Sequence, residues 1–362
     1  MSLPSIDPTH YGTQLVEKVT RFKQAFAPLD LPEPEVFPSA PSHYRMRAEF
    51  RMWHEDGRID YVMFDPADPK RRIVVDAFPA AAAPIYHLMP RLRERLQVSD
   101  ELRRKLFQVE FLATLSGELM VGLIYHRPLD ESWTQAARTL AAELQVQVIG
   151  RSRKQKIVLD RDWLLESFDL NGRPVRYMQI EGSFTQPNGG VNRQMLGWAC
   201  AQASGVGGDL LELYCGNGNF TVALAPLFGR VLATEVSKSS VHAAQYNLTA
   251  NGVDNVALVR MSSDEISAAL ARRRVFRRMQ DVDLDRYRFS TLFVDPPRAG
   301  LDEPTLELAG GFDRILYISC NPQTLHANAK ALQSTHRIAA SAAFDQFPYT
   351  HHLECGLLLV RR

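Results

Sequence analysis

Residues 209–220 read DLLELYCGNGNF, an apolar strand that runs into a glycine-rich turn and then into the start of a helix. In an open α/β sheet, a strand-to-helix turn of this kind lies at the carboxyl end of the strand, where nucleotide-like ligands bind. Glycine at 216 and 218 lets the backbone approach such a ligand closely. The stretch therefore predicts an α/β domain with a ligand site at this turn, built around Gly216 and Gly218.

The next strand supplies a partner for a ribose. Residues 230–235, RVLATE, end in Glu235, whose carboxylate can accept hydrogen bonds from both ribose hydroxyls. The third glycine of the dinucleotide fingerprint is absent, because Phe220 and Thr221 follow, and no P-loop lysine is present. S-adenosylmethionine therefore fits this pattern better than NAD or ATP. For either feature alone, a turn that only reverses the chain is the competing interpretation.

Around this stretch the sequence alternates between strand-like and helix-like segments from residue 209 to residue 319. Such alternation favours a doubly wound, mostly parallel, Rossmann-like sheet. Two closing segments, residues 336–347 and 354–362, are expected to add edge strands, one of them antiparallel. We expect this α/β domain to occupy residues 171–362.

The first part of the chain has a different texture. Residues 13–27 carry apolar side chains at helical spacing, and the proline-rich residues 31–42 then end the helix. This predicts a helical arm and linker over residues 1–40. From residue 44 to residue 53 apolar side chains alternate with Arg45, Arg47, Glu49, Arg51 and Trp53, which predicts a strand with one polar face.

Further strand-like and helix-like segments follow that strand. The strands are expected at 59–65, 71–78, 106–115 and 118–126, and the helices at 85–97 and 131–145. Residues 41–170 are therefore expected to form an α+β domain in front of the α/β domain.

Composition limits the class of protein. Of the 362 residues, 45% are hydrophobic and 23% are charged, and the net charge is +1, so disordered and collagen-like chains are excluded and any nucleic-acid surface must be local. There is no secretory signal pattern and no apolar run of about 18 residues, so we expect a cytoplasmic protein without a membrane partner. The four cysteines form no CxxC pair, and no metal is expected.

Two motifs at the carboxyl edge of the sheet indicate residues that take part in a reaction. The strand TLFVD ends at Asp295, and Pro296 and Pro297 make the following loop rigid, a feature that also suits a purely structural turn. The strand RILYIS delivers Cys320 before Asn-Pro at a helix start. Amides at that helix start could lower the pKa of the thiol and favour the thiolate, although a lone cysteine more often packs as a small hydrophobe.

Glu354 is the first residue of the apolar run ECGLLLV. A carboxylate is unusual there unless it lies at an exposed edge of the sheet or has a functional role. Beside a cysteine nucleophile it is a candidate general base. The neighbouring pair His351 and His352 has no matching carboxylate spacing and makes a poor metal site.

At these motifs the sequence resembles the bacterial tRNA (uracil-5-)-methyltransferases, within the RNA 5-methyluridine methyltransferase family. The resemblance is carried by LLELYCGNGNF (210–220), FVDPPRAGLD (293–302), ILYISCNP (315–322), FDQFPYTHHLECG (344–356), SFTQPN (183–188) and HYRMRAEFR (43–51), which together span most of the chain. It implies an S-adenosylmethionine-dependent enzyme that makes 5-methyluridine at position 54 in the T loop of tRNA. No cysteine precedes residue 200, so the iron–sulfur cluster typical of the ribosomal-RNA relatives is not expected.

The resemblance also implies roles for individual residues. Cys320 would be the nucleophile and Glu354 the base. Around the cofactor and target it places Gln186, Tyr214, Asn219, Glu235 and Asp295.

This chemistry requires a uridine flipped out of its stack, because the reagents need both faces of the base. The residues expected to hold RNA by phosphate contact or base stacking are Arg45, Arg47, Arg51, Phe107 and His126, and the basic segment 151–156 is a further candidate. The expected partner is the T arm of tRNA, with other RNAs that carry a T-arm-like hairpin, and the chain is expected to act as a monomer. Residues 41–170 would then be the RNA-binding domain.

Three alternatives stay open from the sequence. The first is a methyltransferase for another RNA, including a uracil in ribosomal RNA. The second is a non-enzymic RNA-binding or folding protein that retains an inactive methyltransferase domain, which the intact Cys320, Glu354 and Glu235 disfavour. The third is a nucleotide-dependent oxidoreductase, which the missing third glycine disfavours.

Overall fold

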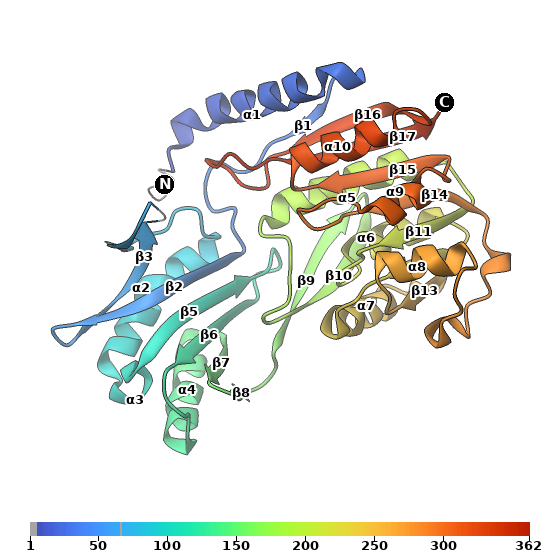
Figure 1. The fold of residues 1–362 in the computed structure, drawn as a ribbon. Helices are drawn as coiled ribbons and strands as arrows, with labels where there is room; N and C mark the ends of the chain where they lie inside the picture. The colour runs from blue at the N-terminus through green and yellow to red at the C-terminus, as the bar shows by residue number, and fades with distance from the viewer. Residues whose placement is uncertain (1–5, 66) are drawn as a thin grey trace.

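The structure is a computed structural model that describes residues 6–65 and 67–362. It contains an eight-stranded sheet, a seven-stranded sheet and a two-stranded hairpin. Figure 1 shows the seven-stranded sheet and its helices on the left and the eight-stranded sheet on the right. The chain thus has an α/β fold with mixed sheets. Within the described ranges, every helix is too short or too polar to cross a bilayer.

The eight-stranded sheet carries the motifs that the sequence singled out. In spatial order its strands are β1 (Glu35–Phe37), β16 (His336–Phe344), β17 (Glu354–Arg361), β15 (Arg314–Ser319), β14 (Phe289–Val294), β11 (Asp209–Leu213), β12 (Val231–Thr234) and β13 (Val256–Val259). All neighbours are parallel except β17, which runs antiparallel to both β15 and β16.

Helices cover both faces of this sheet. One face packs against α5 (Gly189–Ala203), α6 (Asn219–Leu224) and α7 (Lys238–Ala250). The other packs against α1 (Tyr11–Phe26), α8 (Ser263–Leu270), α9 (Glu303–Ala309) and α10 (Pro322–Leu332). Successive residues of β11, Leu210 and Leu211, enter opposite cores, because side chains alternate along a strand. This is the doubly wound arrangement that the sequence predicts.

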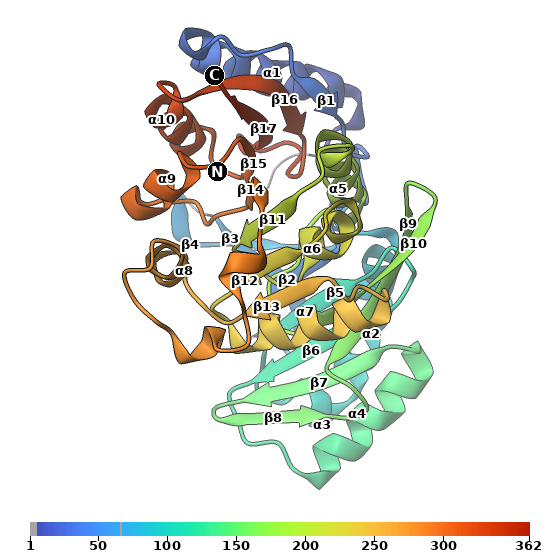
Figure 2. The ribbon, with the colours of Figure 1, turned by 90° about the vertical axis from the view of Figure 1, so that its right-hand side faces the viewer.

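Two details of the predicted sheet are wrong. The antiparallel strand β17 was expected at the edge, but it lies inside the sheet. The preceding strand β16 does not pair with β15, and β17 is inserted between these two strands. The outer edge is β1, which comes from the proline-rich segment expected to be only a linker and pairs in parallel with β16. Helix α1 lies at this same end of the sheet in both views (Figures 1 and 2).

The seven-stranded sheet is mostly antiparallel. Its order is β4 (Asp68–Val74), β3 (Arg58–Asp65), β2 (Arg47–Glu55), β5 (Leu106–Ala113), β6 (Leu119–Tyr125), β7 (Gln147–Ser152) and β8 (Gln155–Val158). Its core side chains pack against α2 (Ala83–Val98), α3 (Asp100–Arg103) and α4 (Glu131–Leu144). The alternation predicted for β2 is confirmed, since Ala48, Phe50 and Met52 are buried while Arg51 and Trp53 are exposed.

A hairpin of β9 (Trp163–Leu170) and β10 (Arg173–Ile180) lies between the two larger sheets. Leu164 packs with residues of the seven-stranded sheet, whereas Leu170 and Tyr177 pack into the core beside α5 and α6. The boundary expected between residues 170 and 171 falls at the tip of this hairpin.

Candidate active site

Two glycines shape the turn after β11. Gly216 and Gly218 have φ values of 56° and 79°, a backbone conformation that favours glycine. A Cβ on Gly216 would meet open space, whereas one on Gly218 would lie 3.4 Å from the Cβ of Ala244 in α7. Gly216 therefore lines the cavity described below, and Gly218, a predicted cofactor residue, lies outside that lining and permits close packing of the turn on α7.

Glu235 connects the turns that follow β11 and β12. Its carboxylate accepts hydrogen bonds from the backbone N–H groups of Gly216 at 3.0 Å, Val236 at 2.8 Å and Ser237 at 2.7 Å. A carboxylate offers about four lone-pair positions, so acceptor capacity remains for a ligand hydroxyl. The side chain is half-buried and faces the same cavity as Gly216.

Paired amides form part of the wall. Asn219, at the start of α6, and Asn192 of α5 exchange two side-chain hydrogen bonds of 2.8 and 3.0 Å. The amide nitrogen of Gln346 donates to Oε1 of Gln186 at 3.2 Å. Such contacts fix the orientation of both predicted cofactor residues, Asn219 and Gln186.

One cavity of about 770 Å³ collects most of the predicted site. Its volume is typical of a small-molecule pocket. The predicted catalytic and cofactor residues that line it are Gln186, Tyr214, Gly216, Asn219, Glu235, Asp295, Cys320 and Glu354.

Cys320 and Glu354 face each other through the sheet register. Strand β15 pairs antiparallel with β17, and the last matched pair is Ser319 with Cys355. The same register extended by one residue puts Cys320 opposite Glu354, at the carboxyl end of β15 and the start of β17. The unexpected interior position of β17 is therefore what brings the two predicted catalytic residues together.

Comparison with known proteins identifies the family. Residues 10–362 match the family model described as tRNA (Uracil-5-)-methyltransferase. The chain belongs to the tRNA (uracil-5-)-methyltransferase family. Two similar curated proteins carry the name tRNA/tmRNA (uracil-C(5))-methyltransferase. The one from Aromatoleum aromaticum is 77% identical over 100% of this chain and 98% of its own length, and the one from Dechloromonas aromatica is 69% identical over 100% of both chains.

A solved structure shares the fold at low sequence identity. The tRNA (uracil-54, C5)-methyltransferase of Pyrococcus abyssi, in complex with S-adenosyl-L-homocysteine, superposes with a TM-score of 0.73 at 21% identity, covering 97% of this chain and 83% of that chain. With the family established, the chain is an enzyme of this methyltransferase class. The alternatives of a non-enzymic RNA-binding protein and of an oxidoreductase are therefore set aside.

Of the two acids in this site, Glu354 is buried and Asp295 is half-buried. Burial raises the pKa of Asp295 to about 7. Burial, together with the nearby Asp295, raises the pKa of Glu354 well above its ordinary value, and Arg298 opposes that shift. A carboxylate with a raised pKa accepts a proton more readily than an ordinary carboxylate does.

The expectation of a lowered thiol pKa at Cys320 is wrong for this structure. Burial raises the pKa of Cys320, and the charges of Glu354 and Asp295 raise it further, while Arg298 acts in the opposite direction. Helix α10 does begin beside the thiol, with Asn321 as its cap. The two carboxyl groups and the loss of water outweigh the amides of that helix start.

Two side chains in the site were not assigned from the sequence. Arg298 follows the two prolines of the rigid loop, and His352 comes shortly before Glu354. Both line the cavity beside Cys320. The signal was present, since both lie inside motifs that carry the family resemblance, but neither residue type by itself indicates a contact with the thiol.

Three of the five predicted RNA contacts form one stack on the seven-stranded sheet. The guanidinium carbon of Arg51 lies 3.8 Å from the ring centroid of Phe107. The ring of Phe107 in turn stacks on His126, with centroids 3.9 Å apart and an interplanar angle of 27°. His126 is exposed, so the stack ends at the surface.

The other two predicted RNA contacts are engaged within the protein. Arg47 donates from Nη1 to the carbonyl of Ser183 at 2.5 Å, and Arg45 donates from Nε to the carbonyl of Arg47 at 2.8 Å. In the basic segment 151–156, Arg151 and Lys156 both pair with Glu181. The contacts of Arg47, Arg151 and Lys156 hold β2, β7 and β8 against residues 181–183, so these side chains are less free for RNA than the sequence indicates.

Proposed function

We propose that this enzyme transfers a methyl group from S-adenosylmethionine to carbon 5 of the T-loop uridine at position 54 of tRNA, giving 5-methyluridine. The observation that carries the proposal is the placement of Cys320 opposite Glu354 on the wall of the cavity that also holds Gly216 and Glu235. The names of the curated relatives support uracil carbon 5 as the site of methylation. The T-loop position rests on the resemblance of the sequence motifs.

The residues of the cavity fit S-adenosylmethionine. Glu235 keeps acceptor capacity for ribose hydroxyls beside Gly216, where the backbone has no side chain in the way. Asp295 faces the cavity and receives no hydrogen bond from the residues that the structure describes, so its carboxylate can face a positively charged ligand. When bound, this cofactor supplies the methyl group on a positively charged sulfur.

Cys320 activates the uracil. Carbon 5 of uracil is a weak nucleophile, and addition of the Cys320 thiolate to carbon 6 makes carbon 5 electron-rich enough to take the methyl group. The thiol must lose its proton for this step, and the proton passes to water because Cys320 is only half-buried. Because Arg298 opposes the rise in the thiol pKa, its positive charge favours the thiolate.

Glu354 completes the reaction. After methyl transfer, carbon 5 carries both the new methyl group and its original proton, while carbon 6 is bonded to sulfur. Removal of that proton by Glu354 forms the carbon 5–carbon 6 double bond and expels the thiolate. The raised pKa of Glu354 suits this role, since a carboxylate of higher pKa is a stronger base.

The two larger sheets divide the work in this proposal. Residues 171–362 hold the cofactor and the catalytic pair. Residues 41–170 bind RNA through the stack at Arg51. The arm of residues 1–40 extends the eight-stranded sheet through β1. The β9–β10 hairpin joins the two parts. We infer that the enzyme acts as a monomer in the cytoplasm.

The relatives' names favour a second substrate. Both include tmRNA beside tRNA. We infer that the enzyme also methylates tmRNA, because a site that reads a T-arm hairpin accepts any RNA that presents one.

The test is methylation of defined RNAs. The enzyme is incubated separately with a tRNA transcript, tmRNA or ribosomal RNA and methyl-labelled S-adenosylmethionine, and each RNA is digested for nucleoside mass analysis. We expect labelled 5-methyluridine with wild-type tRNA and none with a transcript that carries cytidine at position 54. Label in the cytidine-54 transcript would overturn the position, and label only in ribosomal RNA would overturn the substrate class.

A further inference from the structure

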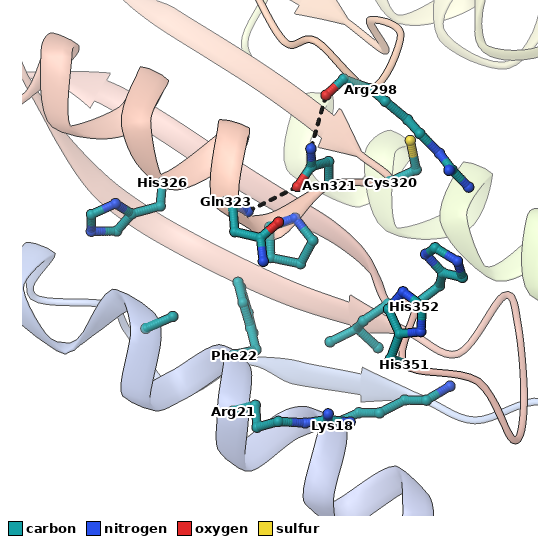
Figure 3. Close-up of a pocket in the computed structure, with 13 residues that line it drawn as sticks. Lys18, Arg21, Phe22, Arg298, Cys320, Asn321, Gln323, His326, His351 and His352 are labelled. Carbon is teal, nitrogen blue, oxygen red and sulfur yellow. Dashed lines mark hydrogen bonds between the residues drawn. The ribbon is translucent and has the colours of Figure 1, made fainter. Parts of the chain in front are cut away.

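A second cavity, of about 630 Å³, opens on the other side of Cys320 between α1 and the start of α10. We call it the arm groove. The ionisable side chains that line it are cationic residues, histidines and the catalytic cysteine, without an acidic side chain: Lys18, Arg21, Arg298, Cys320, His326, His351 and His352. Figure 3 shows that Lys18 and Arg21 come from α1 and His326 from α10, that Cys320 lies in the turn before α10, and that Arg298, His351 and His352 come from the loops before α9 and β17.

Two of the cations are free to meet an anion. Arg21 is exposed and donates only a 3.4 Å hydrogen bond to the carbonyl of Glu17. Arg298 is also exposed, and neither guanidinium forms an ion pair with a carboxylate in the described part of the chain. Lys18 differs, because it is buried and paired with Asp345.

The arm groove meets the cofactor cavity at the reacting atom. Arg298, Cys320 and His352 line both spaces. A nucleotide whose base is bonded to Cys320 has a ribose and two phosphodiesters that must leave the catalytic cavity. The arm groove is a cationic path that begins at the thiol, so its chemistry matches the RNA backbone beside the target nucleotide.

We propose that the arm groove binds the phosphates of the RNA strand adjacent to the target uridine, with Arg21, Arg298 and His351 as the contacting side chains. The inference rests on the proposed function and deepens it. It assigns the N-terminal arm, through Arg21, a direct part in substrate binding, in addition to the stack at Arg51 on the other sheet.

The test compares Arg21→Ala with Lys23→Ala in the full-length enzyme. Both residues are exposed on α1, but Lys23 pairs with Glu33 and does not line the groove, which makes it a matched control. Binding of a T-arm hairpin is measured over a range of salt concentrations. We expect Arg21→Ala to weaken binding about fivefold and to reduce the salt slope by about 1, with Lys23→Ala close to wild type.

A neutral backbone locates the contact. Hairpins with a single methylphosphonate within a few nucleotides of the target should bind wild type more weakly than the unmodified hairpin. When the methylphosphonate replaces the phosphate that Arg21 contacts, Arg21→Ala should bind the modified and unmodified hairpins with equal affinity. Equal binding and equal salt slopes for wild type and Arg21→Ala would overturn the inference. Methylation of the unmodified hairpin by wild type is scored separately, so a failure of the proposed function is recognised by the absence of 5-methyluridine.

Discussion

The ammonium group of Lys18 lies 2.7 Å from a carboxylate oxygen of Asp345, and both side chains are fully buried. The same lysine donates to the carbonyl of Phe347 at 2.8 Å, and Gln14 donates to the other oxygen of Asp345 at 2.8 Å. Helix α1 thereby fixes the loop that leads from β16 to Glu354. The arm is thus part of the framework that supports Glu354, the proposed base.

The first prediction removes one charge of this pair. Lys18→Met leaves the Asp345 carboxylate buried without its partner, and we expect the free energy of unfolding to fall by about 3 to 5 kcal/mol. The double substitution Lys18→Met with Asp345→Leu should recover much of that loss, because no charge is left unpaired. Urea unfolding measures both, with Lys23→Met on the exposed side of α1 as control. A loss below that of the control would show that the pair does not stabilise the fold.

The sequence predicted what depends on local pattern. The glycine turn at Gly216, the acid at the end of the next strand and the alternating strand at Arg51 are each visible within a few residues. The pairing of β1 with β16 was not predicted, because a three-residue strand among prolines has no periodicity to detect. Lys18 and Asp345 were missed for a related reason, since a charged residue on a helix normally indicates a solvated face.

The second prediction concerns the cofactor. Glu235→Gln removes the charge but keeps an oxygen for part of the backbone contacts, and Glu235→Ala removes both. We expect Glu235→Ala to weaken binding of S-adenosylhomocysteine by about 1 to 3 kcal/mol and the glutamine variant to fall between it and wild type. Calorimetric titration of proteins with matched melting temperatures measures the effect. Unchanged affinity in folded Glu235→Ala would reject the assignment.

The third prediction tests the proposed RNA-binding stack on the seven-stranded sheet. Phe107→Ala removes the ring between Arg51 and His126, and we expect affinity for a T-arm hairpin to fall by about 1 to 3 kcal/mol, the usual contribution of one aromatic stacking contact. Affinity for S-adenosylhomocysteine should not change. A matched control is Phe276→Ala, which removes a ring that also carries an arginine, Arg274, at 4.8 Å but belongs to the catalytic part of the chain. Equal hairpin binding by Phe107→Ala and wild type would exclude the stack from RNA recognition.

The fourth prediction follows from a buried acid beneath the site. Glu212 lies in the middle of β11, and burial raises its pKa from 4.5 to about 8. Between these pH values the unfolded chain has released the proton that the folded chain keeps, so the folded state binds more protons and its stability falls as pH rises through this window. We therefore expect Glu212→Gln to gain stability relative to wild type with increasing pH, by at most about 1.4 kcal/mol per pH unit. Urea unfolding near pH 5 and near pH 8 should give that trend, and a constant difference between the proteins would contradict it.

The chemistry of the thiol shows where sequence reasoning ends. Helix α10 starts beside Cys320 as predicted, and its amides alone would favour the thiolate. Burial raises the pKa of Cys320 most, and Glu354 and Asp295, which approach from two other strands, raise it further. The sequence shows neither the burial nor this approach. Electrostatics at a site depends on which groups the topology brings together, a property that a linear motif does not record.

The last prediction separates the proposed nucleophile, Cys320, from the proposed base, Glu354, because the first would form the covalent intermediate and the second would allow it to break down. Cys320→Ala cannot form the bond to carbon 6, so it should give neither 5-methyluridine nor an RNA adduct that survives a denaturing gel. Glu354→Gln retains the thiol and can still add to the base and accept the methyl group, but the carbon 5 proton stays in place, so a methylated covalent adduct should accumulate. Because Glu354 is buried opposite Cys320, the isosteric glutamine keeps the packing at the end of β17.

A T-arm RNA with 5-fluorouridine at the target should trap wild type in the same way, since fluorine cannot leave as a cation. The measurement is a denaturing gel with methyl-labelled cofactor, in which Cys355→Ala, a neighbouring buried thiol outside the cavity, is the control that should turn over normally. An adduct with Cys320→Ala would reject Cys320 as the nucleophile, and rapid turnover by Glu354→Gln would reject Glu354 as the base.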